Sequence, residues 1–213
     1  MAHVFITGGT GYMGQGLIAG LLASGHRVRA LARPGSERKL PSGCEPVTGD
    51  ALDATSYAAA VAPSDTFIHL VGVAHPGPGK ARQFQEIDLA SARIAASAAK
   101  AAGISHFIYV SVAQPAPVMQ AYVAARMAAE QAIRDAGLDA TILRPWYVLG
   151  PGHRWPYPLL PLWRLLECLP VTRDTARRLG FVTLAQMNNA LLKAVEEPAS
   201  GLKVLTVPDI RAM

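Results

Sequence analysis

The sequence predicts an α/β fold, a doubly wound parallel sheet in a single domain over residues 1–213. Strand-like and helix-like segments alternate along the chain, and strands joined by helices of about 10 to 15 residues require crossovers that pair the strands in parallel. Hydrophobic residues make up 51% of the chain and charged residues 16%. Such an apolar composition fits a sheet that is covered on both faces.

Short apolar segments are the expected strands, and segments with helical periodicity are the expected helices. The expected strands are residues 4–6, 28–31, 45–47, 66–71, 107–110, 140–143 and 202–206. The expected helices are residues 14–24, 57–61, 84–102, 122–136 and 184–196. Gly25, Gly103 and Gly137 follow three of these helices and predict where they end.

A glycine-rich turn joins the first expected strand to the first expected helix. Its spacing is Gly8-x-x-Gly11-x-x-Gly14. Glycines allow a tight turn and the close approach of backbone N–H groups to a pyrophosphate, and the start of the helix adds a partial positive charge. The turn therefore predicts a bound dinucleotide. Its expected contacts are Gly8, Thr10, Gly11, Tyr12, Met13 and Gly14.

The end of the second expected strand indicates which dinucleotide is bound. NAD sites usually carry an acidic residue there, which binds the ribose 2′-hydroxyl. This chain reads Ala30-Leu31-Ala32-Arg33-Pro34, with no carboxylate. Arg33 could bind a 2′-phosphate or stack on adenine, or it could be a solvated loop arginine. We therefore expect NADP in preference to NAD.

Residues 7–14, TGGTGYMG, resemble the cofactor turn of the short-chain dehydrogenase/reductase superfamily, in its extended or atypical branch. The pair Gly49-Asp50, residues 69–72 (HLVG), residues 109–111 (YVS) and residues 143–152 (LRPWYVLGPG) are similar to later segments of that superfamily. The resemblance implies a Rossmann-type fold with an NAD(P) cofactor. It covers the chain to about residue 152, and residues 151–213 would form a reduced C-terminal substrate portion.

The resemblance also implies further cofactor contacts and a catalytic group. The implied contacts are Asp50, Ala51, Leu70, Val71, Gly72, Pro145 and Val148. The superfamily uses a tyrosine and a lysine four residues apart on one helix, together with a serine. Here the candidates are Ser111, Tyr122 and Arg126.

Tyr122 and Arg126 share one helix face, because side chains four residues apart are neighbours on a helix. A free tyrosine titrates near pH 10 and needs a neighbouring cation to act as a base at neutral pH. Arg126 could supply that charge, although its planar fork differs from a lysine in reach and hydration. Either Tyr122 is the general acid/base and Ser111 orients a carbonyl or hydroxyl, or Tyr122 only packs or contacts the ribose.

These alternatives lead to two functions. The leading one is an NADP-dependent oxidoreductase acting on a small, apolar carbonyl or alcohol. The other is a non-catalytic NAD(P)H-binding protein, a redox sensor or an accessory subunit. A nucleotide-sugar epimerase or dehydratase is less favoured, because only about 60 residues follow Gly152 and leave little room for a sugar-nucleotide lobe.

Residues 151–171 interrupt the alternation and are rich in Pro, Trp, Tyr and Leu, so we expect an insertion over the sheet edge. For the apolar stretch 154–170 the favoured interpretation is core packing against the last helix. It could also cover the substrate pocket, form a dimer contact, or dip into a membrane interface beside Arg154 and Arg164, the least favoured of these alternatives.

The net charge of +5 comes from scattered basic residues, without the basic, aromatic-interleaved face of a nucleic-acid binder. No apolar run reaches the roughly 18 residues of a membrane span, and the N-terminus does not read as a signal peptide. We therefore expect a cytoplasmic protein with a small-molecule substrate. The histidines and the two cysteines lack metal-ligand spacing, and no metal is expected.

Overall fold

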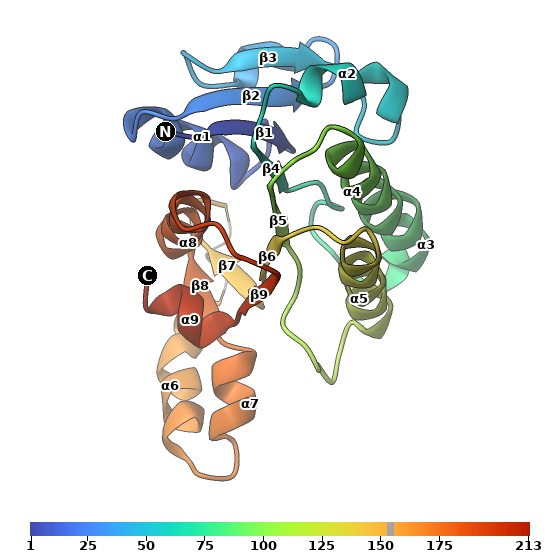
Figure 1. Ribbon diagram of the computed structural model, residues 1–213. Helices are drawn as coiled ribbons and strands as arrows, with labels where there is room; N and C mark the ends of the chain where they lie inside the picture. Colours follow the sequence, from blue (N-terminus) through green and yellow to red (C-terminus); the bar gives the residue numbers. More distant parts are fainter. Residues whose placement is uncertain (153–155) are drawn as a thin grey trace.

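The computed structural model describes residues 1–152 and 156–213. Its main sheet has the strand order β3-β2-β1-β4-β5-β6-β9, and neighbouring strands pair in parallel (Figure 1). The strands are β1 His3–Thr7, β2 Arg27–Ala32, β3 Glu45–Thr48, β4 Thr66–His69, β5 His106–Val110, β6 Ala140–Leu143 and β9 Leu202–Leu205. The order reverses between β1 and β4, and the carboxyl ends of strands at such a point are where ligands bind in open α/β sheets.

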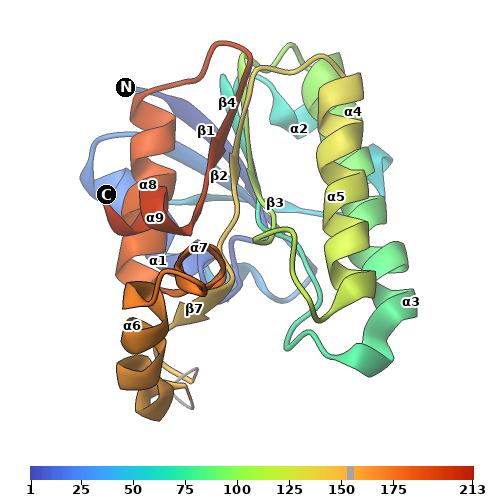
Figure 2. The ribbon, with the colours of Figure 1, turned by 90° about the horizontal axis from the view of Figure 1, so that it is seen from below.

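Helices cover both faces of the sheet (Figure 2). On one face lie α1 Gly14–Ala23, α8 Leu184–Glu196 and α9 Val207–Arg211. On the other lie α2 Ala58–Val61, α4 Ala90–Ala101 and α5 Gln120–Asp135. The expected Rossmann-type, doubly wound parallel sheet is therefore confirmed.

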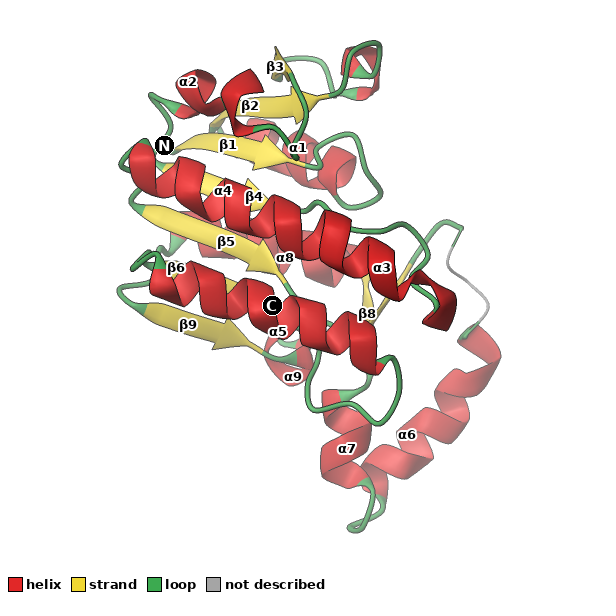
Figure 3. Ribbon diagram, turned by 90° about the vertical axis from the view of Figure 1, so that its right-hand side faces the viewer, coloured by secondary structure: helices red, strands yellow, loops and turns green. Residues whose placement is uncertain are grey.

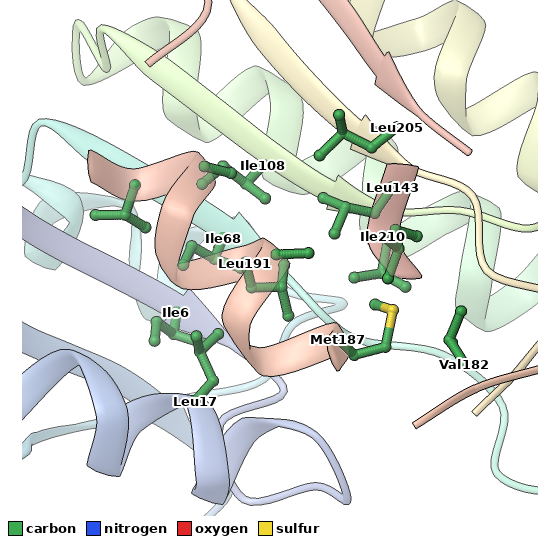
Figure 4. Close-up of a cluster of buried hydrophobic side chains, with 14 of the residues drawn as sticks. Ile6, Leu17, Ile68, Ile108, Leu143, Val182, Met187, Leu191, Leu205 and Ile210 are labelled. Atoms are coloured by element: carbon green, nitrogen blue, oxygen red, sulfur yellow. The ribbon is translucent and has the colours of Figure 1, made fainter. Parts of the chain in front are cut away.

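Each face of the sheet has its own hydrophobic core. Under α1 and α8, Ile6 and Ile68 of the sheet meet Leu17 and Leu191 of the helices (Figure 4). On the opposite face the rings of Phe5, Phe67 and Phe107 lie side by side on neighbouring strands, with centroids 5.2 Å apart in each pair. The alanines of α4 pack over these rings, because a small side chain lets the helix approach the sheet closely.

The expected strands and helices are confirmed, with small differences at their ends. The strand expected over residues 66–71 ends at His69, so Leu70 to Gly72 lie in the following loop. The helix expected over residues 84–102 begins with a π-helical turn, Phe84–Leu89, before α4. The elements that the sequence did not predict include β7 Tyr147–Leu149, β8 Phe181–Thr183, α6 Leu160–Cys168, α7 Arg173–Arg178 and α9.

Helices α6 and α7 form a hairpin that projects away from the main sheet (Figures 1 and 3). No residue of α6 is buried, so the expected core packing against the last helix is wrong for this helix. Trp163 makes an inward contact: its Nε1 donates to the carbonyl oxygen of Ala176 at 2.8 Å, and its ring meets Phe181. His153, Arg154 and Trp155 lie outside the described residues.

Candidate cofactor site and active site

The glycine-rich turn runs from the end of β1 to the start of α1. Gly8 has a φ of 81°, which favours glycine, and a Cβ atom there would lie 2.8 Å from the carbonyl carbon of Leu70 and 3.0 Å from the backbone nitrogen of Val71. A Cβ atom at Gly14 would lie 2.5 Å from the carbonyl oxygen of Gly8. The amide of Gly11 closes the turn by donating to that same oxygen at 3.0 Å. The residues present therefore fit a dinucleotide, whose pyrophosphate needs such a glycine turn at a helix start.

The rest of the expected turn contacts lie on either side of these glycines. The side chain of Gln15 donates to the carbonyl oxygen of Thr10 at 3.1 Å, which fixes the tip of the turn. Tyr12 is 37% exposed, and its hydroxyl lies beside Gly150, where a side chain would collide with it. Tyr12 thus links the glycine turn to the segment that follows β7.

The expected adenine-side residues lie at the carboxyl ends of β2 and β3. The amide of Gly49 donates to the carbonyl oxygen of Ala32 at 3.0 Å, which brings Asp50 beside the end of β2. Asp50 accepts the amide of Leu52 at 3.0 Å. Arg33 is exposed and forms no ion pair with any described residue. Its charge is thus accessible to a ligand at this end of the sheet.

One pocket at the carboxyl edge brings together cofactor-side and catalytic candidates that are far apart in the sequence. Its lining includes Met13 of the glycine turn, Leu70 after β4 and Ser111 after β5. The other lining residues are Val110, Val112, Tyr122, Arg126, Pro145, Trp146 and Val148. Ala51 lies apart from this pocket, packed against the aromatic core, and Gly72 lies behind it, against Arg126.

Arg126 is buried beside Tyr122, as the spacing on α5 predicts. Its Nη2 lies 2.7 Å from Oδ1 of Asp88, and its Nη1 donates to the carbonyl oxygen of Val110 at 2.9 Å and to the hydroxyl of Tyr109 at 3.2 Å. Its Cζ lies 5.2 Å from the centroid of the Tyr122 ring, within the range of a cation–π contact. These hydrogen bonds and the ion pair therefore fix the guanidinium in position, with one side of it facing the ring of Tyr122.

Arg126 and Asp88 form a buried ion pair, and each charge affects the pKa of the other group. Burial disfavours the guanidinium cation of Arg126, yet the neighbouring Tyr109, Tyr122 and Asp88 outweigh that cost and raise its pKa above the ordinary value. Burial raises the pKa of the Asp88 carboxyl, and the charge of Arg126 opposes that rise. Asp88 also accepts the amide of Val73 at 2.9 Å. Asp88 was not predicted from the sequence, where its only signal is an acidic residue beside an alanine-rich helix.

Tyr122 lies between the pocket and the ring of Phe84. Its ring is half-buried and contacts the ring of Phe84 at a centroid distance of 5.0 Å. Because Phe84 begins the π-helical turn that also carries Asp88, the same turn positions both the tyrosine ring and the arginine beneath it. Whether the hydroxyl transfers a proton stays a prediction.

Ser111 lines the pocket, but its hydroxyl donates to Oε1 of Glu130 at 2.6 Å. Glu130 is 1% exposed and also accepts from Gln114 at 2.9 Å, from Arg144 at 2.6 and 2.9 Å and from Arg134 at 3.1 Å. Glu130 and Arg134, four residues apart on α5, are therefore part of a larger cluster around a buried carboxylate, which the sequence did not predict. The role of Ser111 in orienting a substrate stays a prediction.

His69 is a buried core histidine, as its place in an apolar strand indicates. One ring nitrogen shares a hydrogen bond of 2.7 Å with Thr7 and the other one of 3.2 Å with Ser91. Burial, aided by the charge of Arg126, lowers the pKa of His69 to about 3, so the ring is neutral at physiological pH. Across residues 1–152 and 156–213, no three His, Cys, Asp or Glu side chains lie close enough together to hold a metal ion.

The fold and the glycine turn define a Rossmann-type dinucleotide-binding protein of the short-chain dehydrogenase/reductase class. The NAD(P)H-binding family matches residues 8–153, which include the turn, the pocket and α5. The chain belongs to this family and is an atypical member of the short-chain dehydrogenase/reductase superfamily.

The curated relatives of the chain include two reductases. The chain is 34% identical over 221 residues to the ceramide reductase of Caulobacter vibrioides, which covers 98% of this chain and 65% of that protein. It is 29% identical over 179 residues to the 2-alkyl-3-oxoalkanoate reductase of Stenotrophomonas maltophilia, covering 74% of this chain and 54% of that protein. The chain thus spans less than two thirds of the length of these relatives.

Among solved structures, the enzyme WbmH of Bordetella bronchiseptica in complex with NAD⁺ superposes with a TM-score of 0.72. The two chains are 18% identical, and the match covers 100% of this chain and 79% of WbmH. At this identity the likeness shows a shared fold.

Proposed function

We propose that the chain is an NADP-dependent reductase that converts the carbonyl of an apolar, alkyl-chain-bearing substrate into an alcohol. The observation that carries the proposal is the position of Tyr122. Its ring lines the same pocket as Met13 of the cofactor turn and lies against the buried guanidinium of Arg126. A proton donor with a fixed cation beside it, next to a dinucleotide site, is what carbonyl reduction requires.

The proposed chemistry divides between the cofactor and the chain. A nicotinamide held at the glycine turn would supply the hydride for the carbonyl carbon. Tyr122 donates its phenolic proton to the carbonyl oxygen, so the carbonyl becomes an alcohol and the tyrosine becomes a phenolate. Arg126 favours that phenolate electrostatically, and the phenolate then takes a proton back from solvent. Asp88 and the carbonyl oxygen of Val110 keep the guanidinium in place during this cycle.

The pocket lining supports an apolar substrate. Besides the expected cofactor contacts, Val112 and Trp146 line the pocket near Tyr122, whereas a nucleotide sugar would require many polar partners. The names of the two curated relatives agree with this, since ceramide and 2-alkyl-3-oxoalkanoates both carry alkyl chains. We therefore propose a substrate with a ketone or aldehyde on an alkyl chain.

Turnover tests the proposal directly. Purified protein is mixed with NADPH and a series of ketones and 3-oxo esters of increasing alkyl length, and NADPH oxidation is followed. We expect Tyr122→Phe to lower kcat by about 10²- to 10⁴-fold while NADPH affinity stays unchanged. The matched control is Tyr109→Phe, which removes a hydroxyl that also contacts Arg126 but lies outside the pocket.

A second function, a non-catalytic redox sensor, is favoured by one observation. The hydroxyl of Ser111 and the guanidinium of Arg126 are both engaged by buried carboxylates, Glu130 and Asp88. Tight NADPH binding without turnover of any carbonyl in the series would replace the reductase proposal by this one.

The NADP preference rests on Arg33 and on the missing carboxylate at the end of β2. We expect Arg33→Ala to weaken NADPH binding by about 10- to 100-fold and to leave NADH binding unchanged, because the fork loses charged hydrogen bonds to a 2′-phosphate. Arg27→Ala, at the opposite end of the same strand, is the control. Equal losses for both cofactors, or none, would contradict the preference.

A further inference from the structure

The hairpin of α6 and α7, together with the turn before it, forms an arm over residues 156–179. Half of the large exposed hydrophobic side chains among the described residues lie in this short stretch. They are Tyr157, Leu159, Leu162, Leu165, Leu169 and Val171, with exposed fractions from 40% for Leu159 to 96% for Val171.

These side chains are exposed because α6 is held to the rest of the chain by one face only, which leaves its other face outward. Trp163 donates to Ala176 on α7, and Glu167 forms an ion pair of 2.7 Å with Arg211 on α9. These two side chains, four residues apart, occupy the inward face of α6. Leu162, Leu165 and Leu169 have the spacing i, i+3 and i+7 and therefore share one outward stripe.

The exposed charges on the arm are mainly basic. Arg164, Arg173 and Arg177 are exposed and form no ion pair with described residues. Of the two acidic residues on the arm, Glu167 is bound to Arg211 and only Asp174 is exposed. A leucine stripe with exposed arginines complements a surface that is apolar beneath and anionic on top.

We propose that the arm attaches this protein to the surface of an anionic lipid bilayer. The leucine stripe enters the boundary between headgroups and acyl chains, and the three arginines bind anionic headgroups. Within the described residues, no helix is long and apolar enough to cross a bilayer.

A second copy of the chain fits the arm less well. A symmetric pair would bury the same stripe on both subunits. Arg164, Arg173 and Arg177 of the two arms would then approach one another, and like charges across an interface are unfavourable. An anionic lipid surface removes this repulsion and turns the same charges into attraction.

Co-sedimentation with vesicles tests the attachment. Wild-type protein is mixed with vesicles of phosphatidylcholine, alone or blended with phosphatidylglycerol. We expect binding to the blend and much weaker binding to phosphatidylcholine alone. The double variant Leu162→Ser/Leu165→Ser should bind the blend at least about tenfold more weakly, because less apolar surface leaves water. Arg173→Gln and Arg177→Gln should each weaken binding about fivefold, and added salt should do the same.

Met127→Ser is the matched control, because Met127 is a hydrophobic residue on α5 with an exposed fraction of 51%, close to that of the two leucines. It should bind vesicles like wild type. Circular dichroism and NADPH affinity check that every variant is folded.

Three results would overturn the attachment: no binding of wild type to the blend, equal binding of the leucine variant, or a dimer in sedimentation velocity that the leucine variant dissociates. The outcome is independent of the proposed reductase activity, because the readout is binding and needs no substrate.

Discussion

At the scale of single residues, Arg126 makes contacts that a lysine could not reproduce. Its fork reaches the carboxylate of Asp88, the carbonyl oxygen of Val110 and the hydroxyl of Tyr109. A compact ammonium group would leave at least one of these buried acceptors without a partner. The departure from lysine is therefore tied to the acidic residue opposite it, and the two positions act as a pair.

We expect Arg126→Lys to lower the free energy of unfolding by about 1 to 3 kcal/mol, the cost of an unsatisfied buried polar group. Urea denaturation measures it, with Arg93→Lys on the exposed side of α4 as the control. The double variant Asp88→Asn/Arg126→Lys should lose less than the sum of the single variants. Strict additivity would mean that the two residues do not interact.

His69 gives the protein an acid-sensitive core. Its pKa is about 3 in the folded chain, against about 6.5 in an unfolded chain, so the unfolded state binds more protons between these values. The contribution of neutral His69 to the free energy of unfolding is therefore fully present above about pH 6.5. It decreases as the pH drops toward 3, by about 1 kcal/mol for each pH unit. His106, with a pKa of about 4, adds to the effect.

Urea denaturation at pH 7 and at pH 5.5 measures this loss. We expect His69→Gln, which can keep hydrogen bonds to Thr7 and Ser91, to reduce the difference between the two values. An unchanged difference would mean that His69 does not carry the effect.

The grouping of Ser111, Tyr122 and Arg126 could be predicted from the sequence, because local spacing shows where a strand ends and which residues share one face of a helix. It could not place Asp88 or Glu130 in the same way. The direction of Asp88 depends on the π-helical turn that precedes α4, and Glu130 is buried because Arg144, which follows β6, lies against it. Both depend on contacts between distant segments, which periodicity does not reveal.

At the scale of elements, the main-sheet strands were predictable because each is a short apolar segment followed by a turn signal. Strands β7 and β8 have three residues each, and α7 and α9 are nearly as short, so they form only through tertiary contacts. Helix α6 lies in the proline-rich segment for which the sequence predicted only an insertion. Pro161 lies in the first turn of that helix, where a missing N–H costs nothing.

The glycine turn can be tested as an element. A Cβ atom at Gly14 would lie 2.5 Å from the carbonyl oxygen of Gly8, so Gly14→Ala should shift the turn, cost about 1 to 3 kcal/mol of stability and weaken NADPH binding at least about tenfold. Gly20→Ala is the control, since a Cβ atom at Gly20 in the same helix meets nothing within 4 Å.

The control should raise stability by about 0.5 to 1 kcal/mol and leave NADPH binding unchanged. Thermal unfolding and fluorescence titration give the two quantities. A Gly14→Ala variant that binds NADPH like wild type would show that the turn tolerates a side chain.

At the scale of the whole molecule, the sheet and the arm differ in how they are stabilised. Strand β5 is buried along its full length between the two hydrophobic cores, whereas α6 has no buried residue. Regions with few buried contacts open locally, at a lower free energy than global unfolding. We expect amide hydrogens of α6 to exchange with solvent faster than those of α8 or β5.

Hydrogen exchange followed by mass spectrometry measures this order. NADPH should slow exchange in the glycine turn and α1 but not in α6, while anionic vesicles should slow it in α6. Equal protection of α6 and α8 without vesicles would show that the arm is as stable as the sheet.

The carboxylate of Glu130 has a consequence for how this chain can change. It receives hydrogen bonds from Ser111 and Gln114 after β5, from Arg144 after β6 and from Arg134 on its own helix. Replacing any one donor leaves the buried carboxylate with fewer hydrogen bonds, and replacing Glu130 alone leaves Arg144 without its carboxylate partner. Substitutions at these positions are therefore coupled, so homologous sequences should either keep the whole set or replace its members together.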